Sequence, residues 1–253
     1  MSNETLLQLL SFVDYTTLSG EDTRERVTHL CQKALALKTQ YPQGGYPAAI
    51  CVYPPFAALV RKLLGTSGIR TACVAGAFPS GQSPLEIKVQ EVRWSIEHGA
   101  QEIDTLLNRG LLLEGRHEEA LAELQAIRRA CKGATLKVIL ETGALESTQQ
   151  IAQATQMAIK AGADFVKTST GKTSPAATLE AVEVMAREVA AHHKATGRKV
   201  GIKPAGGITT ASEAQAYMEL IRTLLGEEWL TPQLFRIGAS RLVANLLQAL
   251  SQN

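Results

Sequence analysis

The stretch DFVKTSTGK, from Asp164 to Lys172, combines the pattern of a buried strand with that of a binding turn. Its first half is a short apolar run around Lys167, typical of a buried strand, and its second half is a turn of hydroxyl residues and glycine that leads toward a helix. An ammonium group in a buried strand is costly unless it is paired or neutralised. Lys167 could reach solvent from an ordinary strand end, or it could lie beside an anion bound by backbone N–H groups at a helix start.

Short β-type runs alternate with longer amphipathic segments along the whole chain. The predicted strands cover residues 12–18, 48–53, 72–78, 102–108, 135–141, 165–169, 200–204 and 235–239. Helices are predicted over 22–37, capped by Asp22, and over 83–98, 114–131, 147–161, 176–196, 210–225 and 240–250. This alternation in 253 residues favours an α/β fold, a single-domain (β/α)₈ TIM barrel over residues 1–253, with an open doubly wound sheet as the alternative.

Charged residues recur at equivalent positions in predicted strands four to seven. Each alternates with apolar neighbours, and together they are Asp104, Lys137, Lys167 and Lys203. If the apolar neighbours face the helices, these side chains converge inside the barrel. Three lysines with one carboxylate leave excess positive charge, and like charges together with desolvation lower a lysine pKa. Imine formation with a carbonyl substrate requires a neutral amine, so we interpret the cluster as catalytic rather than as structural ion pairs.

Glycine-rich turns follow the last three predicted strands, where barrels often bind phosphate. They contain Thr170, Gly171 and Lys172, then Gly206 and Gly207, and finally Gly238, Ser240 and Arg241. A single glycine indicates only a tight turn. Three such turns on adjacent strands favour a phosphate site made of backbone N–H groups. The two basic side chains would add charge to that site or extend into solvent.

Composition argues against several other classes of protein. The chain has 26 basic and 24 acidic residues and no basic cluster with interleaved aromatics, so we expect no nucleic-acid partner. No apolar run approaches the roughly 20 residues that span a bilayer, and residues 1–10 lack a signal-peptide pattern, so we expect a cytoplasmic protein without a membrane partner. The four cysteines are widely spaced, which predicts reduced and mostly packed thiols. The histidines form no ligand pair, so we expect no metal.

Motifs along nearly the whole chain resemble the deoxyribose-phosphate aldolase family. The most specific are FVKTSTG (165–171), GIKPAGG (201–207) and EID (102–104), and the others are DYTTL (14–18), AICVYP (49–54), FPSG (78–81) and LKVILETG (136–143). The resemblance implies a class I aldolase with a (β/α)₈ fold and no cofactor. Such enzymes reversibly cleave 2-deoxy-D-ribose 5-phosphate to D-glyceraldehyde 3-phosphate and acetaldehyde, in deoxyribose-phosphate catabolism. The implied partners are this phosphosugar and acetaldehyde, and a homodimer is expected.

The resemblance also implies a role for each residue of the cluster. Lys167 would form the imine, and Lys203 would lower the pKa of Lys167 and relay protons. Asp104 would act with a bound water as general acid/base, and Lys137 would support this network. Thr16, in the motif DYTTL (14–18), is a further expected substrate contact, in addition to the residues of the glycine-rich turns.

This sequence departs from the family pattern at two places. Arg241 stands where many members have a small hydroxyl residue, and the chain ends in Ser251-Gln252-Asn253 where some members end in tyrosine. Cys51, near the expected site, is predicted to be a packed core thiol. If it were exposed to the pocket, an unsaturated aldehyde could alkylate it.

Two other functions remain open from the sequence. The first is a different Schiff-base sugar-phosphate aldolase with a longer donor, because the sequence does not give the size of the donor pocket. The second is a non-catalytic phosphosugar-binding barrel, which would not need a lysine of depressed pKa.

Overall fold

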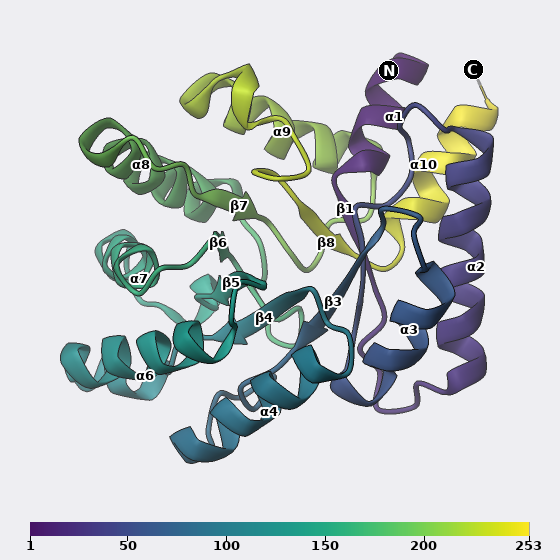
Figure 1. Ribbon diagram of the computed structural model, residues 1–253. Coiled ribbons are helices and arrows are strands. Elements are labelled where there is room, and N and C mark those ends of the chain that lie inside the picture. The colour runs from purple at the N-terminus through teal and green to yellow at the C-terminus, as the bar shows by residue number, and fades with distance from the viewer. Residues whose placement is uncertain (253) are drawn as a thin grey trace.

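The computed structural model, which describes residues 1–252 and leaves Asn253 outside the description, is a barrel of strands surrounded by helices (Figure 1). The strands within residues 1–252 are β1 (Val13–Thr16), β2 (Ala49–Val52), β3 (Arg70–Val74), β4 (Glu102–Leu106), β5 (Thr135–Ile139), β6 (Phe165–Lys167), β7 (Gly201–Lys203) and β8 (Ile237–Ala239). Neighbours pair in parallel in the order β7-β6-β5-β4-β3-β2-β1-β8. Parallel bridges Ile202–Phe235 and Ala205–Gly238 join the two ends of this order. The predicted (β/α)₈ TIM barrel is therefore confirmed.

Helices occupy the connections between the strands. They are α1 (Asn3–Ser11), α2 (Arg24–Gln40), α3 (Ala57–Leu64), α4 (Leu85–Glu97), α5 (Arg109–Leu113), α6 (His117–Ala130), α7 (Thr148–Lys160), α8 (Leu179–Thr196), α9 (Ala211–Leu225) and α10 (Leu242–Ser251). Each predicted helix is present with its ends shifted by a few residues. The prediction did not include α1, α3 and α5, of which α3 and α5 have only 8 and 5 residues, too few to show a clear helical period.

The predicted cap of α2 was wrong by one residue. The hydroxyl of Thr23 accepts the capping hydrogen bond from the Arg26 N–H at 3.2 Å. The carboxylate of Asp22 instead accepts from the Thr17 hydroxyl at 2.6 Å and the Ser19 N–H at 3.0 Å. Asp22 therefore closes the loop between β1 and α2.

The helix after β6 begins three residues later than predicted, and the turn that was expected to lead toward it is separate from it. Helix α8 begins at Leu179 with Thr178 as its cap, so the turn at Gly171 lies in a loop and is not itself a helix N-terminus. Pro175 gives a physical reason, because the residue before a proline is disfavoured in the helical conformation. Any anion at this turn would be bound by loop backbone.

Strand register determines which side chains face the barrel interior. Asp104 lies opposite Lys137 across β4 and β5, and Lys167 lies opposite Lys203 across β6 and β7. Their apolar neighbours are fully buried in the main core between strands and helices: Ile103, Leu136, Val138, Val166 and Ile202. Alternation therefore turns all four charged residues inward, as predicted.

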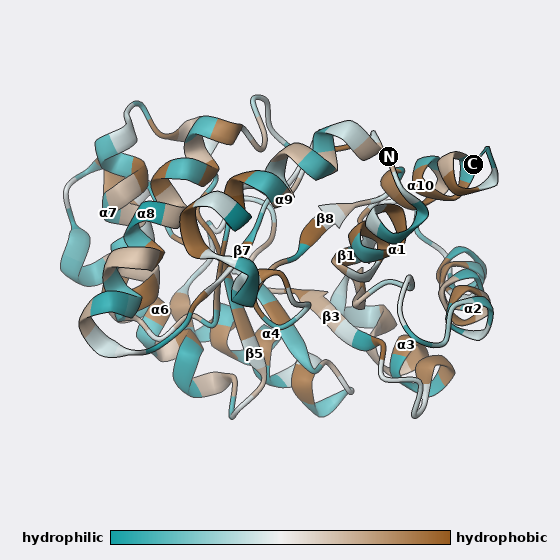
Figure 2. Cartoon of the chain, turned by 90° about the horizontal axis from the view of Figure 1, so that it is seen from above, coloured by the Kyte–Doolittle hydropathy of each residue, from teal (hydrophilic) through white to brown (hydrophobic). Residues whose placement is uncertain are grey.

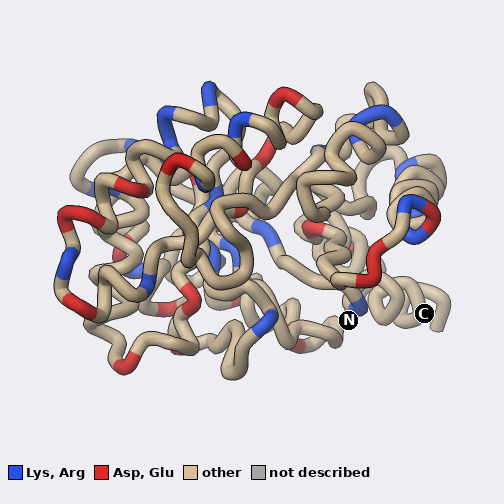
Figure 3. The backbone as a smooth tube through the Cα atoms, turned by 90° about the horizontal axis from the view of Figure 1, so that it is seen from below, with Lys and Arg blue, Asp and Glu red and all other residues tan. Residues whose placement is uncertain are grey.

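The outer layer is amphipathic. Helices carry apolar and polar faces (Figure 2), and acidic and basic residues are spread over the outside of the barrel (Figure 3). Helices α1 and α10 pack side by side, so the two chain ends are close together (Figure 1). The four cysteines are buried and free, in agreement with the prediction. In the part of the chain that the structure describes, no helix has the length and apolarity needed to cross a membrane.

Gly201 provides a test of the barrel packing. A Cβ atom at this position would lie 2.3 Å from the ring of Phe165 on the neighbouring strand, so the ring would have to move. We expect Gly201→Ala to cost about 2 kcal/mol and to lower the unfolding temperature by about 5 °C. Gly20→Ala is the matched control, because nothing lies within 4 Å of that Cβ position. Equal thermal unfolding curves for the two variants would contradict the packing argument.

Candidate active site

The carboxylate of Asp104 binds three lysines inside the barrel. Lys137 donates a hydrogen bond to Oδ1 of Asp104 at 3.0 Å. Lys167 and Lys203 both donate to Oδ2 at 2.7 Å. Each of these side chains is almost completely buried. The structure therefore brings together the four residues of the predicted cluster around one carboxylate.

Three further charged side chains belong to this cluster and were missed in the sequence. They are Asp14 of β1, Glu102 of β4, and Arg236, which precedes β8. Arg236 lies 2.5 Å from Asp14 and 3.0 Å from Glu102. The expected single carboxylate is thus replaced by three, facing four cations, and the excess positive charge is smaller than the sequence suggested. Strand alternation could have found Glu102, which lies two residues before Asp104 and shares its face.

The three lysines differ in the carboxylates that they contact among residues 1–252. Lys137 contacts Asp14 at 3.2 Å, Glu102 at 2.5 Å and Asp104 at 3.0 Å. Lys203 contacts Asp14 at 2.5 Å and Asp104 at 2.7 Å. Lys167 contacts Asp104 alone. Negative charge around the ammonium groups therefore decreases from Lys137 to Lys203 to Lys167.

The pKa values follow this difference. Burial lowers the pKa of Lys167, the Lys203 charge lowers it further, and Asp104 does not fully compensate, so the pKa lies below its ordinary value. Burial also disfavours the ammonium form of Lys203, but Asp104 and Asp14 outweigh this and raise its pKa. The pKa of Lys137 is raised well above its ordinary value, since its carboxylates outweigh burial. Burial alone would raise the pKa of Asp104, but the three lysines together hold it well below its usual range.

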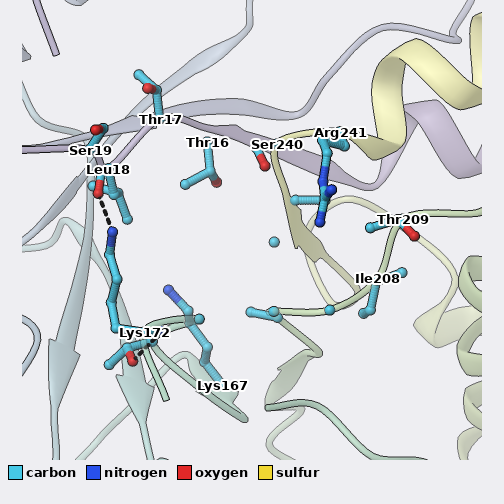
Figure 4. A pocket seen from close by; sticks show the side chains of 17 residues that line it. Thr16, Thr17, Leu18, Ser19, Lys167, Lys172, Ile208, Thr209, Ser240 and Arg241 are labelled. Carbon is cyan, nitrogen blue, oxygen red and sulfur yellow. Dashed lines mark hydrogen bonds between the residues drawn. The ribbon is translucent and has the colours of Figure 1, made fainter. Parts of the chain in front are cut away.

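A cavity of about 400 Å³ opens at the C-terminal ends of the strands, and Lys167 is the member of the cluster that lines it (Figure 4). The cavity wall also contains every predicted substrate contact: Thr16, Thr170, Gly171, Lys172, Gly206, Gly207, Gly238, Ser240 and Arg241. These residues come from the ends of β1, β6, β7 and β8, so one opening joins the candidate nucleophile to the glycine-rich turns.

The rim of this cavity suits an anion. Hydrogen bonds within residues 1–252 leave the backbone N–H groups of Gly171, Gly207 and Ser240 without a partner. The lining includes the cationic side chains of Lys172 and Arg241, and no carboxylate of residues 1–252 belongs to it. Lys172 also donates to the Leu18 carbonyl oxygen, which links the loops after β6 and β1 (Figure 4).

Cys51 does not line the cavity. It is fully buried in a small apolar cluster with Leu18, Ala49, Ala72 and Val74. Burial raises the pKa of its thiol to about 11. Cys51 is therefore a packed core thiol, as predicted, and is poorly placed for alkylation.

Comparison with known proteins places this geometry in a family. Residues 8–223 match the model of the DeoC/LacD family aldolases. The chain belongs to the DeoC/LacD aldolase family. The chain is therefore an enzyme of the aldolase type.

Several members of the family are close in sequence or structure to this chain. It is 44% identical to the deoxyribose-phosphate aldolase of Mus musculus over 251 residues, which cover 95% of this chain and 79% of the mouse protein. It is 42% identical to the human deoxyribose-phosphate aldolase with the same coverage. A solved tetrameric deoxyribose phosphate aldolase from Aeropyrum pernix superposes with a TM-score of 0.75 at 26% identity, covering 99% of this chain and 98% of that one.

Asp14 allows a test of the buried cluster. Burial alone would raise its pKa, but Lys137, Lys203 and Arg236 together lower it below its ordinary value. Its carboxylate therefore contributes stability that is fully present above a pH of about 4 and is lost as the pH falls toward the lowered pKa. We expect Asp14→Asn to cost about 3–5 kcal/mol at pH 7, because it removes one of three buried carboxylates that face four buried cations and so leaves more positive charge uncompensated.

The measurement is thermal unfolding of wild type and Asp14→Asn between pH 3 and pH 7. The difference in unfolding temperature between the two proteins should become smaller toward pH 3, because the wild-type carboxylate contributes less stability there. Glu228→Gln is the control, because Glu228 is exposed and lies 3.9 Å from its partner Lys199. If the difference in unfolding temperature for Asp14→Asn stays constant with pH, the pKa of Asp14 is not lowered by its buried cations.

Proposed function

We propose that this chain is a class I aldolase that reversibly cleaves 2-deoxy-D-ribose 5-phosphate to D-glyceraldehyde 3-phosphate and acetaldehyde. The observation that carries the proposal is the shared contact of Lys167 and Lys203 with one oxygen of Asp104, with the pKa of Lys167 lowered and that of Lys203 raised. One lysine is thereby suited to attack a carbonyl and its neighbour to remain a cation. The names of the relatives support the choice of sugar.

Lys167 begins the reaction. Its neutral amine attacks C1 of the open-chain sugar aldehyde, and loss of water from the carbinolamine gives a protonated imine. The ammonium of Lys203 can donate a proton to the departing hydroxyl group. Lys137, bound to three carboxylates, holds Asp104 in place.

Cleavage then breaks the bond between C2 and C3. The C3 hydroxyl loses its proton, C3 becomes the aldehyde of glyceraldehyde 3-phosphate, and the bonding electron pair moves toward the imine to form an enamine. Asp104 is the base, and it acts through a water that carries the proton onward, because its buried carboxylate does not line the cavity. Protonation of the enamine at C2 and hydrolysis release acetaldehyde and restore Lys167.

The 5-phosphate lies at the rim of the cavity in this proposal. Free N–H groups of Gly171, Gly207 and Ser240 would bind its oxygens. Lys172 and Arg241 would add charge to the same site. Thr16 lines the wall on the β1 side and would contact the sugar between phosphate and imine.

We infer a homodimer in the cytoplasm, acting on small phosphosugars without a cofactor and without a nucleic-acid or membrane partner. The tetramer named for the Aeropyrum pernix protein describes that protein, so sedimentation of this chain would decide between two and four subunits.

Borohydride trapping tests the imine. Incubation with 2-deoxyribose 5-phosphate and borohydride should place a reduced adduct on Lys167, found by peptide mass mapping, and Lys167→Leu should abolish both adduct and turnover. Release of glyceraldehyde 3-phosphate without any adduct would reject the Schiff-base mechanism. Neither adduct nor turnover would favour a binding protein or a different sugar.

The pH profile tests Lys203. Its positive charge lowers the pKa of Lys167, after burial, so Lys203→Leu should raise that pKa and move the low-pH limb of kcat/KM to higher pH. We expect kcat to fall by about 10²–10⁴-fold as the proton donor is lost. Lys199→Leu, at a partly exposed lysine outside the cluster, should leave the profile unchanged. Full activity with an unshifted profile in Lys203→Leu would remove Lys203 from the mechanism.

A further inference from the structure

Glu141 has an unusual place beside the cavity. It follows β5 and adopts the left-handed conformation, with φ 55° and ψ 58°, although it is not glycine. Its side chain is completely buried. Such a conformation costs of order 1–3 kcal/mol and persists where the surroundings require it, commonly near functional sites.

The buried carboxylate of Glu141 binds the loop after β6 through a single residue. Oε1 accepts from the Thr170 N–H at 3.0 Å, and Oε2 accepts from the Thr170 hydroxyl at 2.6 Å. Thr170 lines the cavity, but both of its donors are used in this way. Its predicted contact with substrate would therefore have to be through its accepting oxygen or its methyl group.

These bonds set the direction of the next hydrogen bond. A carboxylate paired with Arg109 accepts, so the Thr170 hydroxyl must donate its proton to Glu141. Its oxygen is then free to accept from the Lys172 N–H, at 3.1 Å. The N–H groups on either side of Gly171 are thus directed into the protein, while the Gly171 N–H has no partner within residues 1–252.

The fixed turn is also packed against the next glycine-rich loop. A Cβ on Gly206 would lie 3.0 Å from the Cα of Gly171, so the two turns approach backbone to backbone. On its other side Glu141 is held by Arg109 at 3.1 Å, and Arg109 donates to the Ser80 carbonyl oxygen at 3.2 Å. Glu141 therefore connects the loops after β3, β4 and β6.

We propose that Glu141 is a positioning residue that, through Thr170, presents the N–H of Gly171 to the phosphate of the substrate. The inference rests on the proposed function, since that function supplies the phosphate. It assigns Thr170 to the support of the site rather than to direct phosphate binding by its N–H. Glu141 acts on substrate binding and leaves the imine chemistry at Lys167 unaltered.

The test compares Glu141→Gln and Thr170→Val with wild type in two measurements. These are KM and kcat for 2-deoxyribose 5-phosphate, and the calorimetric Kd for inorganic phosphate. Loss of a buried hydrogen-bond partner should raise KM and the phosphate Kd by about tenfold each and change kcat less than about threefold. Thr170→Ser, which keeps the hydroxyl, should restore both constants to near the wild-type values.

Glu146→Gln is the matched control, because it is the same substitution at an exposed position of the same loop. Thr170→Val keeps the test decisive if Glu141→Gln fails to fold. A phosphate Kd unchanged in Thr170→Val, or a loss confined to kcat, would overturn the inference. If the wild-type protein binds phosphate but cleaves no sugar, the proposed function is rejected. The phosphate Kd values of the variants would still decide the role of Glu141. Wild type that binds no phosphate would overturn the inference as well.

Discussion

The contact of three lysines with one buried carboxylate is the constraint on which the rest of the structure depends. Taking Asp104 and its lysines out of water is expensive, and their mutual attraction compensates only if every member has a partner. The members come from β1, β4, β5, β6 and β7 and from Arg236 before β8. Closure of the parallel strands into a ring brings these residues, which are far apart in sequence, to one point, so the ion pairs of the cluster in turn hold the ring closed.

The same cluster gives similar side chains different chemistry. Lys167 and Lys203 lie in register on adjacent strands and share an oxygen of Asp104, yet their pKa values move in opposite directions. The difference comes from Asp14, which contacts Lys203 and not Lys167 among the described residues. A single additional carboxylate at the β1 side thus separates a lysine suited to attack from one suited to donate a proton. The mechanism depends on this asymmetry more than on the number of lysines.

Much of the fold was predictable because it follows from local periodicity. Alternation along the strands was enough to turn Asp104, Lys137, Lys167 and Lys203 inward, and the glycine-rich turns identified the cavity wall. Arg236 could not be placed in the same way, since it precedes the short strand β8 and its partners are distant in sequence. The pattern of charges along the strands also did not separate Lys167 from Lys203, because Asp14 was not assigned to the cluster, and the expected roles of the two lysines came from the family resemblance.

The orientation of the turn that we propose for phosphate binding could not be predicted from the sequence for a different reason. The sequence predicted a turn after β6 that leads toward a helix, but the turn lies in a loop whose N–H directions are set by Glu141. That control depends on a left-handed backbone at a glutamate, which no propensity predicts. Tertiary hydrogen bonds, rather than a helix terminus, therefore orient the N–H groups of this turn.

The positive charges of Lys172 and Arg241 at the cavity rim affect both phosphate binding and the pKa of Lys167 in the proposed complex. A phosphate dianion stabilises any ammonium group near it, whereas imine formation needs the Lys167 amine to be neutral. Two unit charges ~10 Å apart interact by about 1.7 kcal/mol at an effective dielectric constant of ~20, which is more than one pKa unit. Lys172 and Arg241, on opposite sides of the rim (Figure 4), offset this field where the proposed phosphate would lie. In the proposed complex, cationic side chains at the rim would therefore bind the phosphate without raising the pKa of Lys167. Neutral N–H groups would offset the phosphate charge less effectively.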